Sequence, residues 1–160
     1  MTMKILISDP NKCNGCRMCR TACAIRKAGI CNPEKSRIKV IQMDECDRYL
    51  PLVCQNCEDA PCIAACPKEA ISRSDDKVVQ TIIDYNKCVG CKMCLNACSF
   101  GTIGFDEDRG RPFKCDLCEG DPLCVHFCEP GALTLKDPTL IQYDQAKVAA
   151  LKRTAGMIRR

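Results

Sequence analysis

The sequence predicts an α+β protein in which short helices and strands surround four groups of cysteines. Three observations lead to this prediction. Cysteine accounts for 18 of the 160 residues. Sixteen of these cysteines fall into four groups of four, and the first half of the chain repeats in the second. A chain of this length forms one compact unit or two very small ones.

Each group holds four cysteines within 11 to 14 residues. The groups are Cys13, Cys16, Cys19, Cys23; Cys54, Cys57, Cys62, Cys66; Cys88, Cys91, Cys94, Cys98; and Cys115, Cys118, Cys124, Cys128. The steps within them are 3-3-4, 3-5-4, 3-3-4 and 3-6-4, so a regular group alternates with a widened one. A shift of 75 residues superimposes the first group on the third together with six flanking residues, which indicates an internal duplication.

Short regular elements are expected within, between and after the groups. Residues 17–27, 92–97 and 122–127 suit short helices. Residues 37–43 and 77–83 are β-branched or alternating, and strand-like pairs recur shortly after the last cysteine of three groups, at residues 70–71, 102–103 and 132–133.

The spacing of the cysteines favours iron–sulfur chemistry. Three thiolates at i, i+3 and i+6 can wrap a loop around one cubane cluster, while the fourth cysteine leads toward a different cluster. Structural zinc is the main alternative, but zinc ribbons use two CxxC pairs separated by a longer loop. We therefore expect four [4Fe–4S] clusters bound by the sixteen cysteines. Gly15 and Gly90 either let the backbone approach a sulfide or only serve a turn.

Charge and hydropathy restrict the functional classes. The formal net charge of +4 counts every cysteine as neutral, and four oxidised clusters would bring it to about −4. With 4% aromatic residues, a nucleic-acid partner is not expected. No run of apolar residues is long enough for a membrane span, and the first ten residues lack a signal sequence. We expect a cytoplasmic protein, where disulfides are rare.

The strings CNGCRMC, LVCQNCEDAPCIAACP, KCVGCKMC and FKCDLC identify a resemblance over residues 3–136. The chain resembles the four-cluster, ferredoxin-like electron-transfer subunits of dimethyl sulfoxide reductase, formate dehydrogenase and membrane hydrogenase systems. It is most similar to the small subunits that accompany tungsten aldehyde oxidoreductases. One departure is that proline directly follows the last cysteine only in the second group, at Cys66.

The resemblance implies two nested bacterial-ferredoxin-like modules, one formed by residues 1–51 with 107–143 and the other by residues 52–106. The implied ligand sets are Cys13, Cys16, Cys19, Cys128; Cys54, Cys57, Cys62, Cys98; Cys88, Cys91, Cys94, Cys66; and Cys115, Cys118, Cys124, Cys23. Spacing alone leaves a tandem pairing open, because both pairings join a regular group to a widened one.

The same resemblance implies a wire of clusters between a tungsten- or molybdenum-pterin catalytic subunit and another redox partner, such as a flavoprotein or a further copy of the chain. No catalytic residue is expected in the chain itself, because every iron would be fully ligated. The alternatives are a free polyferredoxin shuttle and a zinc-bound interaction module.

Several further residues carry expectations of their own. Residues 144–160 should form an amphipathic C-terminal helix that docks on another chain or packs on the cluster domain. Cys31 and Cys46 are expected to be buried free cysteines, with a role as spare ligands as the alternative. His126 should face a loop, with tuning of a cluster or coupling of a proton as the alternative. Lys12, Lys87 and Lys114 each precede a group and either raise a cluster potential or are simply solvated.

Overall fold

The structure is a computed structural model that describes residues 4–43, 48–74 and 80–137. Its helices are α1 (Met18–Ala28), α2 (Pro61–Ala64), α3 (Met93–Ala97) and α4 (Leu123–His126), with 3-10 turns η1 (Pro33–Lys35) and η2 (Leu117–Gly120). Its strands are β1 (Ile5–Ser8), β2 (Lys39–Met43), β3 (Arg48–Leu52), β4 (Ile71–Ser74), β5 (Gln80–Ile83), β6 (Gly104–Asp106), β7 (Arg111–Phe113) and β8 (Leu133–Lys136). The fold is a small mixture of short helices and strands, in agreement with the predicted class.

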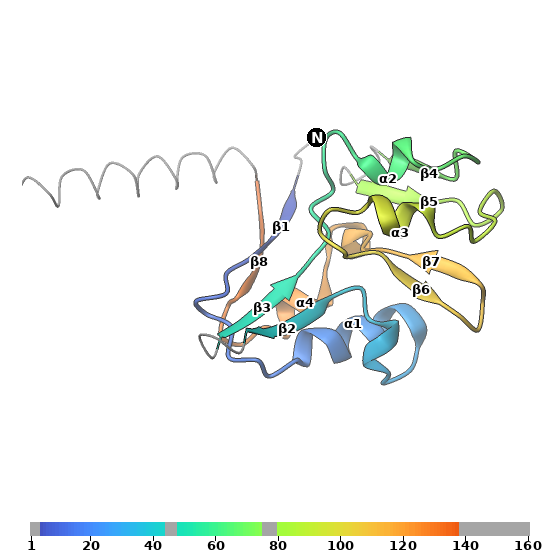
Figure 1. Ribbon diagram of the computed structural model, residues 1–160. Coiled ribbons are helices and arrows are strands. Elements are labelled where there is room, and N and C mark those ends of the chain that lie inside the picture. The colour runs from blue at the N-terminus through green and yellow to red at the C-terminus, as the bar shows by residue number, and fades with distance from the viewer. Residues whose placement is uncertain (1–3, 44–47, 75–79, 138–160) are drawn as a thin grey trace, which may run out of the picture.

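The strands form four separate antiparallel pairs, β1–β8, β2–β3, β4–β5 and β6–β7. Strand β1 pairs with β8 from Ile5 opposite Lys136 to Ser8 opposite Leu133, which brings the two ends of the described chain together. In Figure 1 these two strands lie with β2, β3, α1 and α4 on one side of the molecule, and α2, α3, β4 and β5 lie on the other. The β6–β7 hairpin runs from Gly104 to Phe113, so it contains the expected boundary between the two modules after residue 106.

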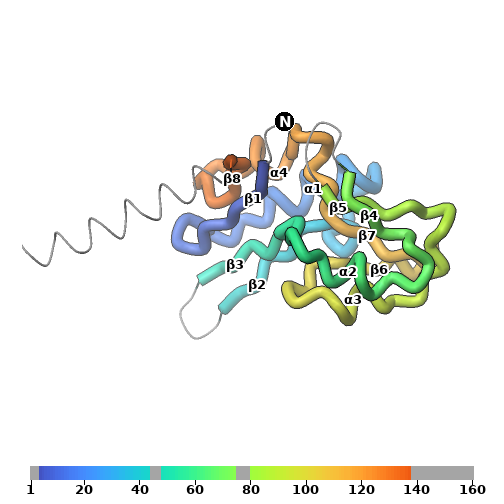
Figure 2. The backbone as a smooth tube through the Cα atoms, turned by 90° about the horizontal axis from the view of Figure 1, so that it is seen from above, coloured from blue at the N-terminus to red at the C-terminus, as the bar shows by residue number. Residues whose placement is uncertain are grey.

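Helix contacts follow the same division. Helix α1 contacts α4, and α2 contacts α3. Figure 2 shows β1 and β8 at one end of the molecule and β4 and β5 at the other. Segments far apart in sequence therefore build one side, and the middle of the chain builds the other.

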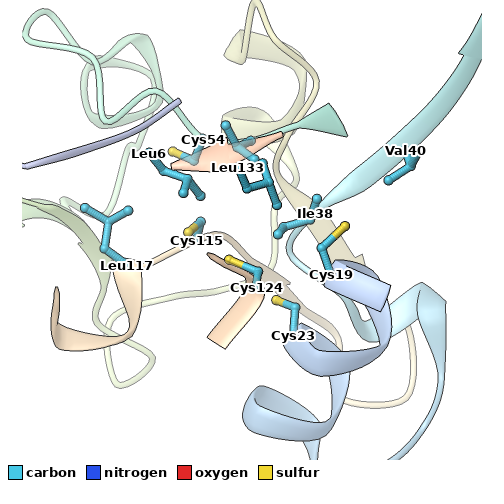
Figure 3. Close-up of a cluster of buried hydrophobic side chains, with 11 residues drawn as sticks. Leu6, Cys19, Cys23, Ile38, Val40, Cys54, Cys115, Leu117, Cys124 and Leu133 are labelled. Carbon is cyan, nitrogen blue, oxygen red and sulfur yellow. The ribbon is translucent and has the colours of Figure 1, made fainter. Parts of the chain in front are cut away.

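Two apolar cores lie in these two parts, and cysteines belong to both. The larger core joins residues from along the chain: Leu6, Cys19, Cys23, Ile38, Val40, Val53, Cys54, Cys115, Leu117, Cys124 and Leu133. Figure 3 shows Cys19 and Cys23 extending from α1 and Cys124 from α4 into this core. The smaller core contains Ala60, Cys62, Ile71, Cys94 and Ile103. With so few aromatic residues, the cysteines occupy volume that larger side chains fill in other small proteins.

The helices predicted over residues 17–27, 92–97 and 122–127 are confirmed as α1, α3 and α4. Helix α1 begins at Met18, because Arg17 has φ 60° and lies in the left-handed region. The strands expected near residues 37–43, 70–71, 77–83 and 132–133 are present as β2, β4, β5 and β8, and β6 begins directly after Ile103. The predicted helix over residues 144–160 and Cys46 lie outside the described residues. No described helix has the length and apolar character needed to cross a bilayer.

Candidate metal centres

Three cavities are each lined by four of the predicted cysteines. We name them with their cysteines as site 1 (Cys13, Cys16, Cys19, Cys128), site 2 (Cys54, Cys57, Cys62, Cys98) and site 3 (Cys88, Cys91, Cys94, Cys66). In each of them, three cysteines come from one group and the fourth comes from another. The remaining lining is mostly apolar at sites 1 and 3, for example Val40 and Leu133 at site 1, whereas site 2 also has polar residues such as Asn56, Thr81 and Lys114.

The remaining four predicted cysteines, Cys115, Cys118, Cys124 and Cys23, form site 4. Burial raises the pKa of Cys124, and nearby Cys115, Cys23 and Cys118 add to this increase. Three of these cysteines are buried in the larger core. The structure thus gathers all sixteen predicted cysteines into four sets, and their role as cluster ligands stays a prediction. Within the described chain, no three Cys, His, Asp or Glu side chains converge on the position of a single metal ion.

The loops of the first and third groups share one backbone conformation. Gly15 and Arg17 have φ values of 73° and 60°, and Gly90 and Lys92 have φ values of 71° and 62°. Left-handed residues within such loops turn backbone N–H groups toward a concave surface, and this arrangement suits an anion. The duplication seen in the sequence is therefore also a duplication of loop geometry.

The two glycines of these loops pack against neighbouring hairpins. A Cβ atom at Gly15 would lie 2.6 Å from the ring of Tyr49, which belongs to β3. A Cβ atom at Gly90 would collide with the backbone oxygen of Gly110, in the turn between β6 and β7. The positive φ and the close hairpin both favour glycine here. The turn and the approach to a sulfide need the same backbone conformation, so the choice between them stays a prediction.

The last cysteine of every group accepts or shares a hydrogen bond at sulfur. The donors are the backbone N–H groups of Arg37 to Cys23 at 3.3 Å, of Ala70 to Cys66 at 3.2 Å and of Leu133 to Cys128 at 3.3 Å. Cys98 instead contacts the hydroxyl of Thr102 at 3.5 Å. Such bonds orient a ligand and stabilise its thiolate form. The strand-like pairs at residues 70–71, 102–103 and 132–133 contain three of these four partners, although their bonds to sulfur were not predicted. Arg37 had no such signal.

The buried thiols favour the protonated form in the absence of metal. Burial raises the pKa of Cys115 to about 12 and those of Cys19 and Cys94 to about 11. Burial also acts to raise the pKa of Cys98, but the hydroxyl and backbone N–H of Thr102 outweigh it and lower this pKa. Because a metal displaces these protons, ligation must supply the free energy of deprotonation.

Site 2 contains a buried donor that lacks a partner within the described chain. Asn56 lines this cavity, and its Oδ1 atom accepts a hydrogen bond from the backbone N–H of Thr81 at 3.1 Å. Its Nδ2 atom is buried and finds no acceptor among the described residues. An unpaired buried amide costs about 1–3 kcal/mol, so this atom fits a cavity that receives an electron-rich group. The thiol-lined walls and the free donor both suit an anionic iron–sulfur cluster.

Electrostatic interactions link the sites in one order. Besides burial, Cys19 of site 1 raises the pKa of Cys124 of site 4. In the same way Cys54 of site 2 acts on Cys115 of site 4, and Cys62 of site 2 acts on Cys94 of site 3. The cysteines therefore connect site 1 to site 4, site 4 to site 2, and site 2 to site 3.

Two expectations about single residues need correction. Cys31 is exposed, because it lies in the loop after Gly29, the C-cap residue of α1, whose backbone is in the left-handed region. The expectation of burial was wrong for this residue. The three lysines were expected either to raise a cluster potential or to be solvated. Lys114 is only 5% exposed, so solvation fails for this residue. Lys12 and Lys87 are exposed. His126, the last residue of α4, is exposed, and its Nε2 atom lies 2.7 Å from Oδ1 of Asp121.

Comparisons with known proteins agree with this geometry. The family described as the 4Fe-4S dicluster domain matches residues 45–138. The polyferredoxin-like subunit of aliphatic sulfonate oxidoreductase from Pyrococcus furiosus is 39% identical, over 82% of this chain and 75% of that protein. The electron transport protein HydN of Escherichia coli is 30% identical, over 96% of this chain and 98% of that protein.

A solved structure shares the fold. A chain of the active-site complex BamBC of benzoyl coenzyme A reductase aligns with a TM-score of 0.50 and 24% sequence identity, over 100% of this chain and 99% of that chain. This similarity concerns the arrangement of the backbone.

Proposed function

The chain belongs to the 4Fe-4S dicluster domain family of iron–sulfur electron-transfer proteins, and we propose that it relays single electrons through four [4Fe–4S] clusters as a subunit of a larger oxidoreductase. The observation that carries this proposal is the gathering of sixteen cysteines into four sets of four, three of which line cavities. Bound clusters would supply the one-electron chemistry. The chain's own residues hold, orient and shield them.

The nested ligand sets are part of the proposal. The lining of site 1 by Cys128, of site 2 by Cys98 and of site 3 by Cys66 supports them. At site 4 the influence of Cys23 on Cys115, Cys118 and Cys124 supports the last set. The antiparallel pairing of β1 with β8 supports a first module built from both ends of the chain. The module boundaries at residues 51–52 and 106–107 and the docking role of residues 144–160 are proposed on the sequence alone.

The order of the sites suits a wire. Because site 4 and site 2 lie between site 1 and site 3 in the chain of electrostatic contacts, an electron could enter at one end and leave at the other. Cys16 of site 1 and Cys91 of site 3 are exposed, which supports contact with other redox centres at both ends. We propose a tungsten- or molybdenum-pterin catalytic subunit as one partner, and a flavoprotein or a further copy of this chain as the other, in the cytoplasm.

Metal and sulfide analysis of anaerobically prepared protein tests the proposal. We expect about 16 iron and 16 acid-labile sulfide per chain, because each cubane contains four of each. Zinc should be nearly absent, and a large partner chain should co-purify. A folded protein with four zinc ions and no broad visible absorption would overturn the iron–sulfur function. A loaded protein that never associates with a partner would instead indicate a free shuttle.

A further inference from the structure

Lys114 is a buried cation without a counter-charge among the residues that the structure describes. Lys114 is 5% exposed, and it is the only buried Lys, Arg or His among residues 4–43, 48–74 and 80–137. Within these ranges no carboxylate lies at ion-pair distance from its ammonium group. An isolated buried charge is costly, so a fold that keeps one has an anion nearby or tolerates a large penalty.

Three neutral acceptors hold the ammonium group in place. Lys114 Nζ donates to the backbone oxygen of Thr81 at 2.7 Å, to that of Cys115 at 3.1 Å and to Asn56 Oδ1 at 3.4 Å. An ammonium has three N–H donors, so none remains for another acceptor. The group is therefore fixed in position, and it can act on a cofactor through its charge.

The fixed charge faces site 2. Lys114 lines the cavity of Cys54, Cys57, Cys62 and Cys98, together with Asn56, whose Nδ2 atom has no partner in the described chain. Burial raises the pKa of Cys62, and Lys114 opposes that increase, so its charge reaches the site. Lys114 also directly precedes Cys115 of site 4 and bonds to its carbonyl oxygen. The cation consequently lies at the junction of the two inner sites.

We propose that Lys114 is a positioning residue whose fixed positive charge raises the reduction potential of the cluster at site 2, an inference that rests on the proposed cluster-binding function. Reduction adds one electron from an upstream cluster or a chemical reductant and changes the charge of a cubane with its four thiolates from about −2 to about −3. No bond or proton is exchanged. A nearby cation stabilises the more negative state, especially in a poorly solvated interior.

The duplication makes this effect asymmetric. A shift of 61 residues superimposes Cys54 and Cys57 on Cys115 and Cys118, and it places Val53 at the position of Lys114. Site 4 does have a lysine close by, but Lys27 Nζ lies 2.7 Å from the carboxylate of Asp116, which offsets its charge. The position equivalent to Lys114 thus carries no charge in the duplicated segment, where Val53 replaces it. The charge of Lys114 should make the cluster at site 2 easier to reduce than it would be without this residue.

Redox titration of the loaded protein, followed by electron paramagnetic resonance, tests this inference. Lys114→Gln should lower the midpoint potential of one cluster while the other three move less. Lys114→Arg should keep that potential near the wild-type value, because the charge remains. The matched control is Lys87→Gln, since Lys87 also precedes the first cysteine of a group but is exposed. The signal that shifts should be the one that Cys98→Ser alters.

The outcomes separate this inference from the proposed function. Iron content and the presence of four titrating clusters in the wild-type protein test cluster binding, independently of Lys114. If Lys114→Gln keeps its iron and all four potentials stay unchanged, the inference is wrong. If both Lys114→Gln and Lys114→Met lose iron, Lys114 is a structural residue and the inference is also wrong. An equal shift in Lys87→Gln would attribute the effect to general surface charge and overturn it.

Discussion

The backbone N–H of Leu133 donates a hydrogen bond to the Sγ atom of Cys128 at 3.3 Å, at the first residue of the last strand. Leu133 also pairs with Ser8 of β1, and both Cys128 and Leu133 line site 1. The last cysteine of the fourth group is thereby held beside the first group. A local hydrogen bond and a long-range strand pair act together to determine which cysteines meet.

Replacement of Cys128 by alanine tests this arrangement. Cys128→Ala removes one thiol from site 1, so it should perturb mainly the cluster held by Cys13, Cys16 and Cys19, with a three-iron cluster as one expected product. Cys98→Ala is the matched variant and should perturb site 2 instead. Cluster-resolved spectroscopy distinguishes the two. A change at site 3 in Cys128→Ala would favour the tandem pairing.

The packing of Gly90 predicts a loss of stability on substitution. Gly90→Ala forces a side chain into φ 71°, which costs about 1–2 kcal/mol, and its Cβ would also collide with the backbone oxygen of Gly110. That oxygen can move only if the β6–β7 turn moves. We expect Gly90→Ala to bleach at lower temperature than the wild type.

Gly29→Ala is the control for this prediction. Gly29 also has φ 71°, but a Cβ atom at this position would meet no described residue within 4 Å. Its substitution should therefore cost only the conformational penalty of about 1–2 kcal/mol. Thermal bleaching of the two variants under anaerobic conditions gives the comparison. If the two variants lowered the bleaching temperature equally, the contact between residue 90 and Gly110 would contribute nothing to the stability.

The sequence predicted the local structure around the cysteines but not their long-range partners. Residues spaced by three and four define both a cluster-binding loop and the first turn of a helix, so the groups and helices α1, α3 and α4 were visible directly. The sequence did not show which group supplies the fourth cysteine of each set, because the duplication makes nested and tandem pairings equivalent in spacing. Strand pairs such as β1–β8 depend on contacts between distant residues, which no local pattern contains.

The burial of Lys114 was beyond local prediction for the same reason. Lys12, Lys87 and Lys114 all precede the first cysteine of a group, yet only Lys114 is buried. The difference comes from tertiary packing, since Thr81 and Asn56 belong to other segments and enclose its ammonium group. A sequence signal can nominate such a residue, but its environment is determined by the fold.

Deletion of residues 144–160 tests the proposed docking helix, which lies outside the described residues. Val148, Leu151, Ala155 and Ile158 share one helical face in the sequence pattern. The truncated protein should keep its iron content and visible spectrum but lose association with its partner or with itself. The measurement is co-purification together with size analysis. A truncated chain that loses clusters while still binding its partner would assign the segment to the fold.

The stability of the loaded protein should fall as the pH is lowered. In the metal-free fold, burial raises the pKa of Cys19 and Cys94 to about 11 and that of Cys115 to about 12, above the ordinary value of 9.0. These shifts alone contribute stability below pH 9 that is lost as the pH rises through the raised values. Ligation reverses the sign, because a bound cysteine must stay a thiolate while the unfolded chain takes up protons below about pH 9.

Guanidinium-induced bleaching of the loaded protein, measured anaerobically at several pH values between about 9 and 6, checks the sign. The midpoint denaturant concentration should decrease steadily as the pH falls, since each released thiolate gains a proton and contributes to the slope. Cys31→Ser is the matched control, because Cys31 is exposed and belongs to none of the four sites. It should leave the slope unchanged. A midpoint that stays constant over this range would follow the metal-free thiols instead, because their raised pKa values lie above it, and it would contradict thiolate ligation by the buried cysteines.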